Sequence, residues 1–239
     1  MKNISVFLAA TALAALLPSA LAGDITGKIT LKGTPPANPE IKDLAADVNC
    51  SKLVTEKVNM PLYVVGAGGE LADVFVTLTG ITGKSTGASA PPAVLDQKGC
   101  QYVPYVSAIQ TKQTLLVKNS DPLLHNVHAT PVAGNSNKER NEAQLAGSAD
   151  LKFTFDAPEK FLRFKCDVHP WMFAYVGVFD HPFFAVTDKD GNFKITGLPN
   201  GKYTLEAWHQ RTHRAEAGLS KEITVDGDAQ VEFTIDAAP

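Results

Sequence analysis

The sequence predicts an all-β protein. Three observations lead to this fold class: apolar and polar residues alternate over short segments, turn-forming residues bound each segment, and helical periodicity is almost missing. The turns are rich in Asn, Asp, Pro and Gly, as at residues 119–122, 156–160, 188–191 and 198–201. Segments of this kind bury one face of a sheet and expose the other.

The chain opens with the pattern of a secretory signal peptide. Lys2 supplies a positive charge, residues 4–17 are mostly apolar, and Pro18 ends the run. Residues 20–22 (Ala-Leu-Ala) form a cleavage site, so we expect cleavage after Ala22 and a periplasmic or secreted mature chain. The apolar run is too short to span a membrane, and no stop-transfer segment follows it.

The predicted strands follow one another along the mature chain. They are expected at residues 25–33, 71–80, 106–110, 114–120, 126–130, 151–155, 161–166, 173–179, 191–197, 202–209 and 231–236. Their Val, Ile, Thr and aromatic residues suit a pleated surface that is buried on one side. Between them we expect a proline-rich surface stretch at 32–40, a connection at 81–94 and a short helix at 138–146.

The charge and the cysteine count narrow the class of protein. Loss of Lys2 with the leader changes the formal net charge from −3 to −4, which disfavours nucleic acid and anionic membranes as partners. Three cysteines in an oxidising compartment indicate one disulfide and one sulfur with another task. Cys166 lies beside a histidine, so we pair Cys50 with Cys100; three unpaired thiols are the alternative.

The stretch KCDVHPWM carries the clearest chemical signal. Cys166, His169 and Met172 are spaced three apart, and Cys166 shares the inward face of its strand with Leu162 and Phe164. A thioether is a soft, weak ligand that suits copper better than zinc. One-electron copper sites combine two imidazoles and one thiolate with a distant methionine. A second histidine is therefore required.

The sequence SDPLLHNVHAT supplies two candidates for that histidine. In an extended chain His125, Val127 and Ala129 share the apolar face, whereas Asn126 and His128 lie on the other. We therefore choose His125 as the fourth ligand and expect His128 at the surface or beside the ligands. Asn126 is expected to brace the two ligand loops by hydrogen bonding.

Residues 95–180 resemble a cupredoxin, a blue copper protein of the amicyanin/plastocyanin-like group. The resemblance rests on Asn119, HNVH at 125–128, DAPEKFLRFKC at 156–166 and the C-x-x-H-P-x-M pattern of the ligand loop. It implies a Greek-key β-sandwich or barrel that holds one type 1 copper ion. The implied ligands are His125, Cys166, His169 and Met172.

One position departs from this pattern. DQKGCQYVP is followed by a histidine in related bacterial proteins, whereas Tyr105 follows it here. Whether Tyr105 or His128 contributes to the metal site is left open.

Residues 183–239 resemble a carboxypeptidase regulatory-like (transthyretin-like) β-sandwich. The matching residues are Asp188, Asp190, Gly191, Phe193, Gly197, Leu198, Pro199, Gly201, Tyr203 and Leu205. The opening strands of that family have counterparts only near the start, at 27–30 and 72–78. We therefore expect one discontinuous immunoglobulin/transthyretin-like sandwich, 24–80 with 183–239, into which the copper domain is inserted. A decorated single sandwich is the alternative.

The sequence favours an electron carrier over an enzyme. A binuclear copper centre needs two loop cysteines, and copper oxidases place histidines beside the cysteine, where this chain has Lys165 and Asp167. A methionine also argues against an open zinc hydrolase site, and the loop geometry argues against a thiol protease. We expect the ring edge of His169 at the surface, within an apolar patch of Pro170, Trp171 and Phe173. A c-type cytochrome or a periplasmic dehydrogenase or oxidase is the expected partner.

Two alternatives remain at this point. A copper carrier or storage protein would use the same ligands, although the mature chain holds only Met60 and Met172 and lacks metal-binding tracts. A binding module with incidental copper would use an aromatic face, for which Trp208 and His209 are the candidates.

Overall fold

The computed structural model describes residues 22–212 and 219–238, so nearly all of the predicted signal peptide lies outside the described residues. The all-β class is confirmed, since strands dominate the described chain. None of the helices in these residues has the length and apolar character needed to cross a membrane. The helical elements are α1 (Lys42–Ala46), α2 (Cys50–Leu53) and the single 3-10 turn η1 (Gly87–Ser89).

The strands alternate with short connections along the chain. Their bounds are β1 Ala22–Lys32, β2 Val74–Thr79, β3 Ala93–Gln97, β4 Tyr102–Val103, β5 Val106–Gln110, β6 Leu115–Asn119, β7 His125–Thr130, β8 Arg140–Gln144, β9 Leu151–Phe153, β10 Glu159–Lys165, β11 Phe173–Phe179, β12 Phe184–Val186, β13 Asn192–Pro199, β14 Gly201–His209, β15 Leu219–Val225 and β16 Ala229–Asp236.

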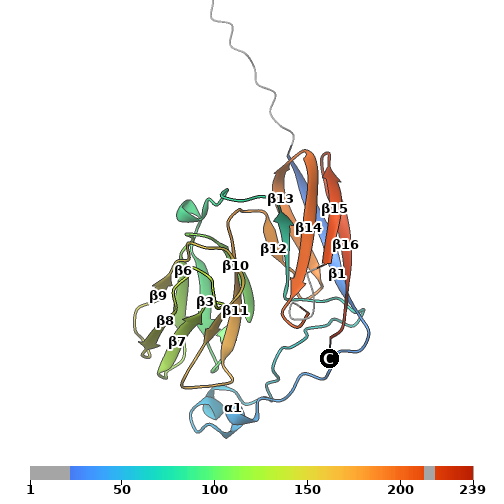
Figure 1. Ribbon diagram of the computed structural model, residues 1–239. Coiled ribbons are helices and arrows are strands. Elements are labelled where there is room, and N and C mark those ends of the chain that lie inside the picture. The colour runs from blue at the N-terminus through green and yellow to red at the C-terminus, as the bar shows by residue number, and fades with distance from the viewer. Residues whose placement is uncertain (1–21, 213–218, 239) are drawn as a thin grey trace, which may run out of the picture.

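One sandwich is built from both ends of the chain (Figure 1). Its two sheets have the strand orders β13-β1-β16 and β12-β2-β14-β15. β1 pairs with β13 and β16, and β2 pairs with β14, so early and late segments share both sheets. Ile25, Leu205 and Phe233 are buried between the sheets. We interpret residues 22–79 and 184–236 as one discontinuous unit.

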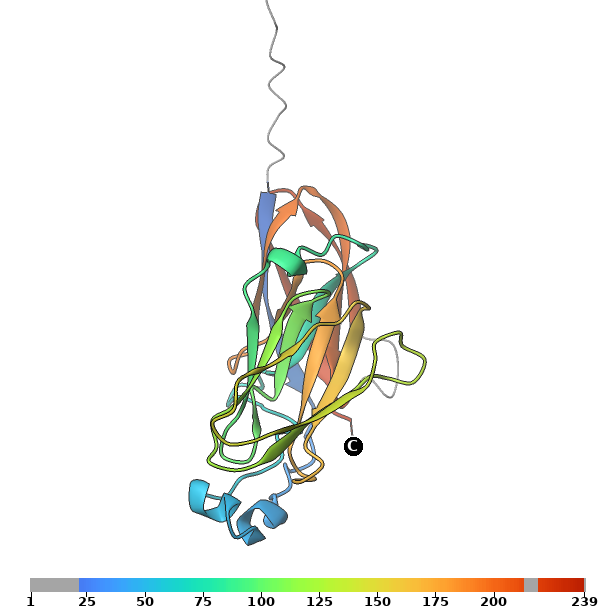
Figure 2. The same cartoon turned by 90° about the vertical axis from the view of Figure 1, so that its left-hand side faces the viewer.

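The second sandwich is built from residues 93–179 and stands beside the first (Figures 1 and 2). Its sheets have the orders β5-β11-β10-β7-β8 and β4-β3-β6-β9. Leu115, Val127 and Phe164 belong to its core. Phe164 in β10 lies opposite Ala129 in β7 and Ala174 in β11. β10 is therefore held between the two strands that border the candidate metal ligands.

Aromatic side chains pack where the two sandwiches meet. Phe75 of β2 is fully buried, with its ring centroid 5.1 Å from that of Phe161 in β10 and 5.9 Å from that of Phe179 in β11. The ion pair between Lys160 Nζ and Glu206 Oε2, at 2.9 Å, also joins the two units. Burial of this apolar cluster fixes one sandwich against the other.

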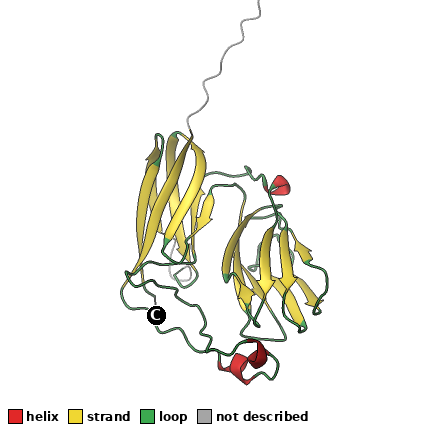
Figure 3. Cartoon of the chain, turned by 180° about the vertical axis from the view of Figure 1, so that it is seen from behind, coloured by secondary structure: helices red, strands yellow, loops and turns green. Residues whose placement is uncertain are grey.

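An excursion between β1 and β2 places α1 and α2 against the far end of the second sandwich (Figures 1 and 3). The Cys50–Cys100 disulfide ties it there, which confirms the predicted pairing. Leu44 and Ile41 pack with the two cysteines in a small separate cluster. The helices have four and five residues, too few to produce a visible helical period in the sequence.

Two sequence expectations are corrected by the structure. The helix expected at 138–146 is strand β8, which pairs antiparallel with β7 and buries Gln144. The polar side chains of this segment do not alternate with apolar ones, because β8 is held in place by backbone pairing. The connection expected at 81–94 already includes η1 and the start of β3, so the second sandwich begins at Ala93.

Gly27 is required where β1 runs between β13 and β16. A Cβ atom at this position would lie 1.8 Å from the backbone oxygen of Val231 and 2.5 Å from the Phe193 ring. We predict that Gly27→Ala lowers the free energy of unfolding by about 1–3 kcal/mol, the usual cost of overpacking. Chemical denaturation tests this, with the exposed Thr26→Ala as matched control. Equal midpoints for the two variants would contradict the packing described.

Candidate metal centre

Neighbouring strands bring the predicted metal ligands together. His125 is the first residue of β7, Cys166 follows the last residue of β10, and His169 and Met172 lie before β11. Two backbone hydrogen bonds close this loop: Cys166 N donates to Met172 O at 2.9 Å, and Met172 N donates to His169 O at 2.8 Å. The loop is therefore fixed by its own backbone and by the paired strands on either side.

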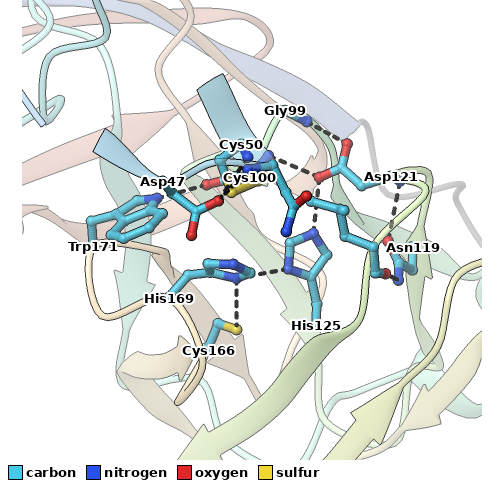
Figure 4. The surroundings of a disulfide bond; sticks show 12 residues. Asp47, Cys50, Gly99, Cys100, Asn119, Asp121, His125, Cys166, His169 and Trp171 are labelled. Carbon is cyan, nitrogen blue, oxygen red and sulfur yellow. Dashed lines mark hydrogen bonds and ion pairs between the residues drawn. A yellow bond between two sulfur atoms is a disulfide. The ribbon is translucent and has the colours of Figure 1, made fainter. Parts of the chain in front are cut away.

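The side chains of His125, Cys166 and His169 converge on one point (Figure 4). Nδ1 of His125 lies 3.1 Å from Nδ1 of His169, and Sγ of Cys166 lies 3.6 Å from the latter. All three donor atoms lie within 4.8 Å of one another. Donors that each lie about 2.0–2.3 Å from a shared ion are separated by roughly 3–4 Å. The spacing therefore fits one ion.

Met172 belongs to the same buried environment. It is 1% exposed and packs in the core cluster that contains Cys166. Together with Tyr102 and Trp171 it lines a cavity of about 40 Å³. Two imidazoles, a thiol and a thioether from the same core cluster form a soft donor set, and copper is the metal that this set fits best.

Asp121 orients the imidazole of His125 through the ring nitrogen that does not face the other donors. Its Oδ2 lies 2.9 Å from Nε2 of His125, which leaves Nδ1 directed at the other donors. Burial alone would lower the pKa of His125, but the hydrogen bond to Asp121 and the interaction with Cys166 raise it to about 9. A carboxylate on the distal imidazole nitrogen is the usual way to fix the tautomer of a metal-binding histidine.

Asn126 holds the two ligand segments together. Its backbone N–H donates to Cys166 Sγ at 3.3 Å, and its Oδ1 accepts a hydrogen bond from Asp167 N at 3.0 Å. Burial would raise the pKa of Cys166, yet the hydrogen bonds from His125, Asn126 and His169 lower it. The thiolate, which is the metal-binding form, is therefore favoured.

His128 points away from this centre. Its Nδ1 lies 2.7 Å from Oδ2 of Asp167, and its Nε2 lies 2.5 Å from Oε1 of Glu139. It is 9% exposed, so it contacts the residue next to Cys166 rather than solvent. Tyr105, the other open candidate, donates its hydroxyl to Gln210 Oε1 at 3.1 Å.

The expected exposure of His169 is wrong. His169 is 6% exposed, because the Cys50–Cys100 disulfide and Asp47, from the segment with α1 and α2, lie beside its ring (Figure 4). Trp171 lies 5.2 Å from it between ring centroids and donates Nε1–H to Cys100 O at 3.1 Å. The tryptophan therefore packs under the cover instead of forming an open patch.

Several solved structures resemble part of this chain. Amicyanin from Paracoccus versutus is 22% identical with a TM-score of 0.32, and the match covers 43% of this chain and 96% of that one. A purple cupredoxin from Nitrosopumilus maritimus is 20% identical with a TM-score of 0.31. This match covers 36% of this chain and 98% of the cupredoxin.

A Cu-containing nitrite reductase (NirK) from Thermus scotoductus SA-01 is 20% identical with a TM-score of 0.34. The match covers 38% of this chain but only 23% of the reductase, so this chain spans less than a quarter of it. No protein-family profile and no curated protein matches the sequence. The carboxypeptidase regulatory-like resemblance of the first sandwich stays a prediction.

Sequence reasoning missed Asp121 and the cover over His169. Asp121 stands four residues before His125, within a stretch that also has the composition of a turn. A carboxylate near a candidate ligand is a usable signal. The sequence signal for the cover, the segment with Cys50 that lies over His169, was weaker. The Cys50–Cys100 pairing predicts that the segments around these two cysteines meet, but not that they meet beside the ligands.

We predict that His125 of the metal-free protein titrates near pH 9 and that Asp121→Asn lowers this pKa. The native pKa lies above the ordinary value of 6.5, so the bound proton stabilises the fold below pH 6.5. That contribution is lost as the pH rises through about 9. An NMR titration of the imidazole ring measures the pKa.

Glu139→Gln is the matched control, because Glu139 contacts His128 instead of His125. A His125 that titrates at the ordinary value in the unmodified protein, or that does not respond to Asp121→Asn, would contradict the assigned hydrogen bond.

Proposed function

We propose that this chain is an exported type 1 copper protein that carries single electrons between redox partners. The observation that carries the proposal is the convergence of the Nδ1 atoms of His125 and His169 with the sulfur of Cys166. Three donors of these types at this spacing match the ligand set of one-electron copper sites. The predicted signal peptide supports export.

When bound, copper would supply a Cu(II)/Cu(I) couple that accepts and releases one electron. His125, His169 and the Cys166 thiolate would hold it, with the Met172 thioether as the weak fourth ligand. The chain's own contribution is rigidity: Asp121 fixes one imidazole, and the backbone N–H of Asn126 fixes the sulfur. Donors that cannot rearrange reduce the structural cost of each change in charge.

Burial supports the same function. His125, Cys166, His169 and Met172 are between 0% and 6% exposed, so water is kept from the donors. A dry hydrophobic shell is one of the features that set the potential of a metal site. It also disfavours a hydrolytic role, which requires an open coordination position.

Because His169 is buried, the docking surface of the proposed carrier is not the patch expected around its ring edge. Exposed apolar side chains occur on the segments around the site: Leu124 before His125, Val168 in the ligand loop, and Val48 and Leu53 on the cover. Small apolar surfaces suit brief encounters between electron-transfer proteins. A c-type cytochrome or a periplasmic dehydrogenase or oxidase remains the proposed partner.

A copper carrier is the second candidate, and the gathering of sulfur around the site favours it. Copper retention under a chelator, together with a reversible redox wave, separates the carrier from the electron-transfer protein. The binding-module alternative loses one of its two candidate residues: His209 is fully buried, with its ring centroid 4.9 Å from that of Tyr63. Trp208 is half-buried, and Nζ of Lys160 lies 3.5 Å from its ring centroid.

We predict that Cys166→Ser abolishes the intense visible absorption of the copper-loaded protein, because that absorption requires the thiolate–copper bond. The matched control is the double variant Cys50→Ser/Cys100→Ser, which removes two sulfurs but none of the proposed ligands and should keep the colour. Visible spectra of copper-loaded, folded samples decide the matter. An unchanged spectrum of Cys166→Ser would exclude the proposed site.

We predict that Met172→Leu retains copper and raises its reduction potential, because the ion loses a weak donor and gains an apolar neighbour of similar size, which disfavours the higher charge of Cu(II). Met60→Leu, the same exchange outside the proposed ligand set, should leave the potential unchanged. Equilibrium redox titration measures both. Complete loss of copper from Met172→Leu would show that the thioether is essential for binding, contrary to the proposed weak role.

A further inference from the structure

Sulfur is concentrated at one end of the second sandwich. The chain has three cysteines and three methionines, and only Met1 lies outside the described residues. The other five belong to or pack against two adjoining clusters: Cys50, Met60 and Cys100 in one, Cys166 and Met172 in the other. Trp171 packs against both clusters. The proposed primary site uses only two of these five sulfurs.

The disulfide lies directly against the imidazole of His169 (Figure 4). The sulfurs of Cys50 and Cys100 and a ring nitrogen of His169 lie within 4.8 Å of one another, and all three residues are buried. Nδ1 of His169 faces Cys166 and His125. This leaves Nε2 as the donor for a second ion beside the first site.

Each cysteine is anchored by contacts that do not depend on the disulfide. The backbone N–H of Cys50 donates to Asp47 Oδ1 at 2.8 Å, and that of Cys100 donates to Asp121 Oδ2 at 2.8 Å. Trp171 Nε1–H holds the carbonyl of Cys100 at 3.1 Å. Cleavage of the S–S bond would therefore leave two thiols facing His169 in a region closed to water.

We propose that reduction of the Cys50–Cys100 disulfide creates a second copper site, in which both thiolates and Nε2 of His169 bind Cu(I). An external dithiol would supply two electrons and two protons, breaking the S–S bond to give two thiols while itself becoming a disulfide. Cu(I) then displaces the two thiol protons and, where Nδ1 of His169 already binds the first ion, the remaining ring proton as well, so that His169 bridges the two ions as an imidazolate. Thiolates select Cu(I) over harder ions, and this site needs neither Cys166 nor Met172.

The proposal is tested by counting Cu(I) bound to the mature chain under anaerobic conditions. Cu(I) is presented as its complex with bathocuproine disulfonate, and its transfer to the protein is read from the loss of the complex's colour. The disulfide is reduced with a phosphine that is then removed by desalting. We expect one equivalent for the disulfide form and two for the reduced form. Cys50→Ser/Cys100→Ser should take one equivalent in both conditions.

A second measurement does not depend on any variant. Cys50 and Cys100 of the reduced protein are alkylated with iodoacetamide, with and without two equivalents of Cu(I), and the modified residues are identified by mass spectrometry. We expect protection of both cysteines by Cu(I). A single equivalent in the reduced protein, or equal alkylation with and without Cu(I), would overturn the proposal.

Cys166→Ser separates this proposal from the primary site. The disulfide form of Cys166→Ser should no longer bind the tightly held equivalent of Cu(I). The reduced form of the same variant should bind one equivalent more than its disulfide form. If the primary site is wrongly assigned, Cys166→Ser and the unmodified protein will bind equally in the disulfide form. The gain on reduction is then still measured independently.

Discussion

The carboxylate of Asp121 joins the parts of this site that come from distant segments. It accepts hydrogen bonds from the backbone N–H groups of Gly99 and Cys100, at 2.7 and 2.8 Å, and lies 2.9 Å from Nε2 of His125. Burial would raise the pKa of Asp121, but the bonds to His125 and the two N–H groups lower it, so the negative charge is kept. The same group thus orients one imidazole and positions the loop that carries the disulfide.

In the proposed electron carrier, the cover over His169 would allow electrons to pass while keeping the ion in place. Electrons can cross a layer of packed side chains, whereas an ion leaves only when its donors become accessible. With the disulfide intact, the segment with α1 and α2 packs at the end of the sandwich, which would help the proposed site to retain its metal. With the disulfide reduced, the proposed second set of donors lies beside the first. The disulfide form would then transfer electrons, and the reduced form would deliver copper.

Local pattern predicted much of this structure. The alternation of His125, Val127 and Ala129 indicated which histidine faces inward, and the structure brings His125, not His128, to Cys166 and His169. The two sandwiches were likewise expected from short alternating segments and from the position of their sequence signatures. These features are encoded within a few consecutive residues, so one sequence suffices to find them.

Features that depend on distant contacts were not predicted. The burial of His169 depends on a segment more than a hundred residues upstream, whose helices are too short to show a period. Strand β8 was misread as a helix because its polar residues give no alternation; its place is set by backbone pairing with β7 and by Gln144, which accepts a 2.6 Å hydrogen bond from Gln97.

X-ray absorption spectroscopy of the copper-loaded disulfide form would identify the atoms bound to the ion. We expect two imidazole nitrogens and one short sulfur contact as the close neighbours of a single copper ion. A first shell made only of nitrogen and oxygen would show that the thiolate of Cys166 is not a ligand, and would contradict the proposed electron carrier.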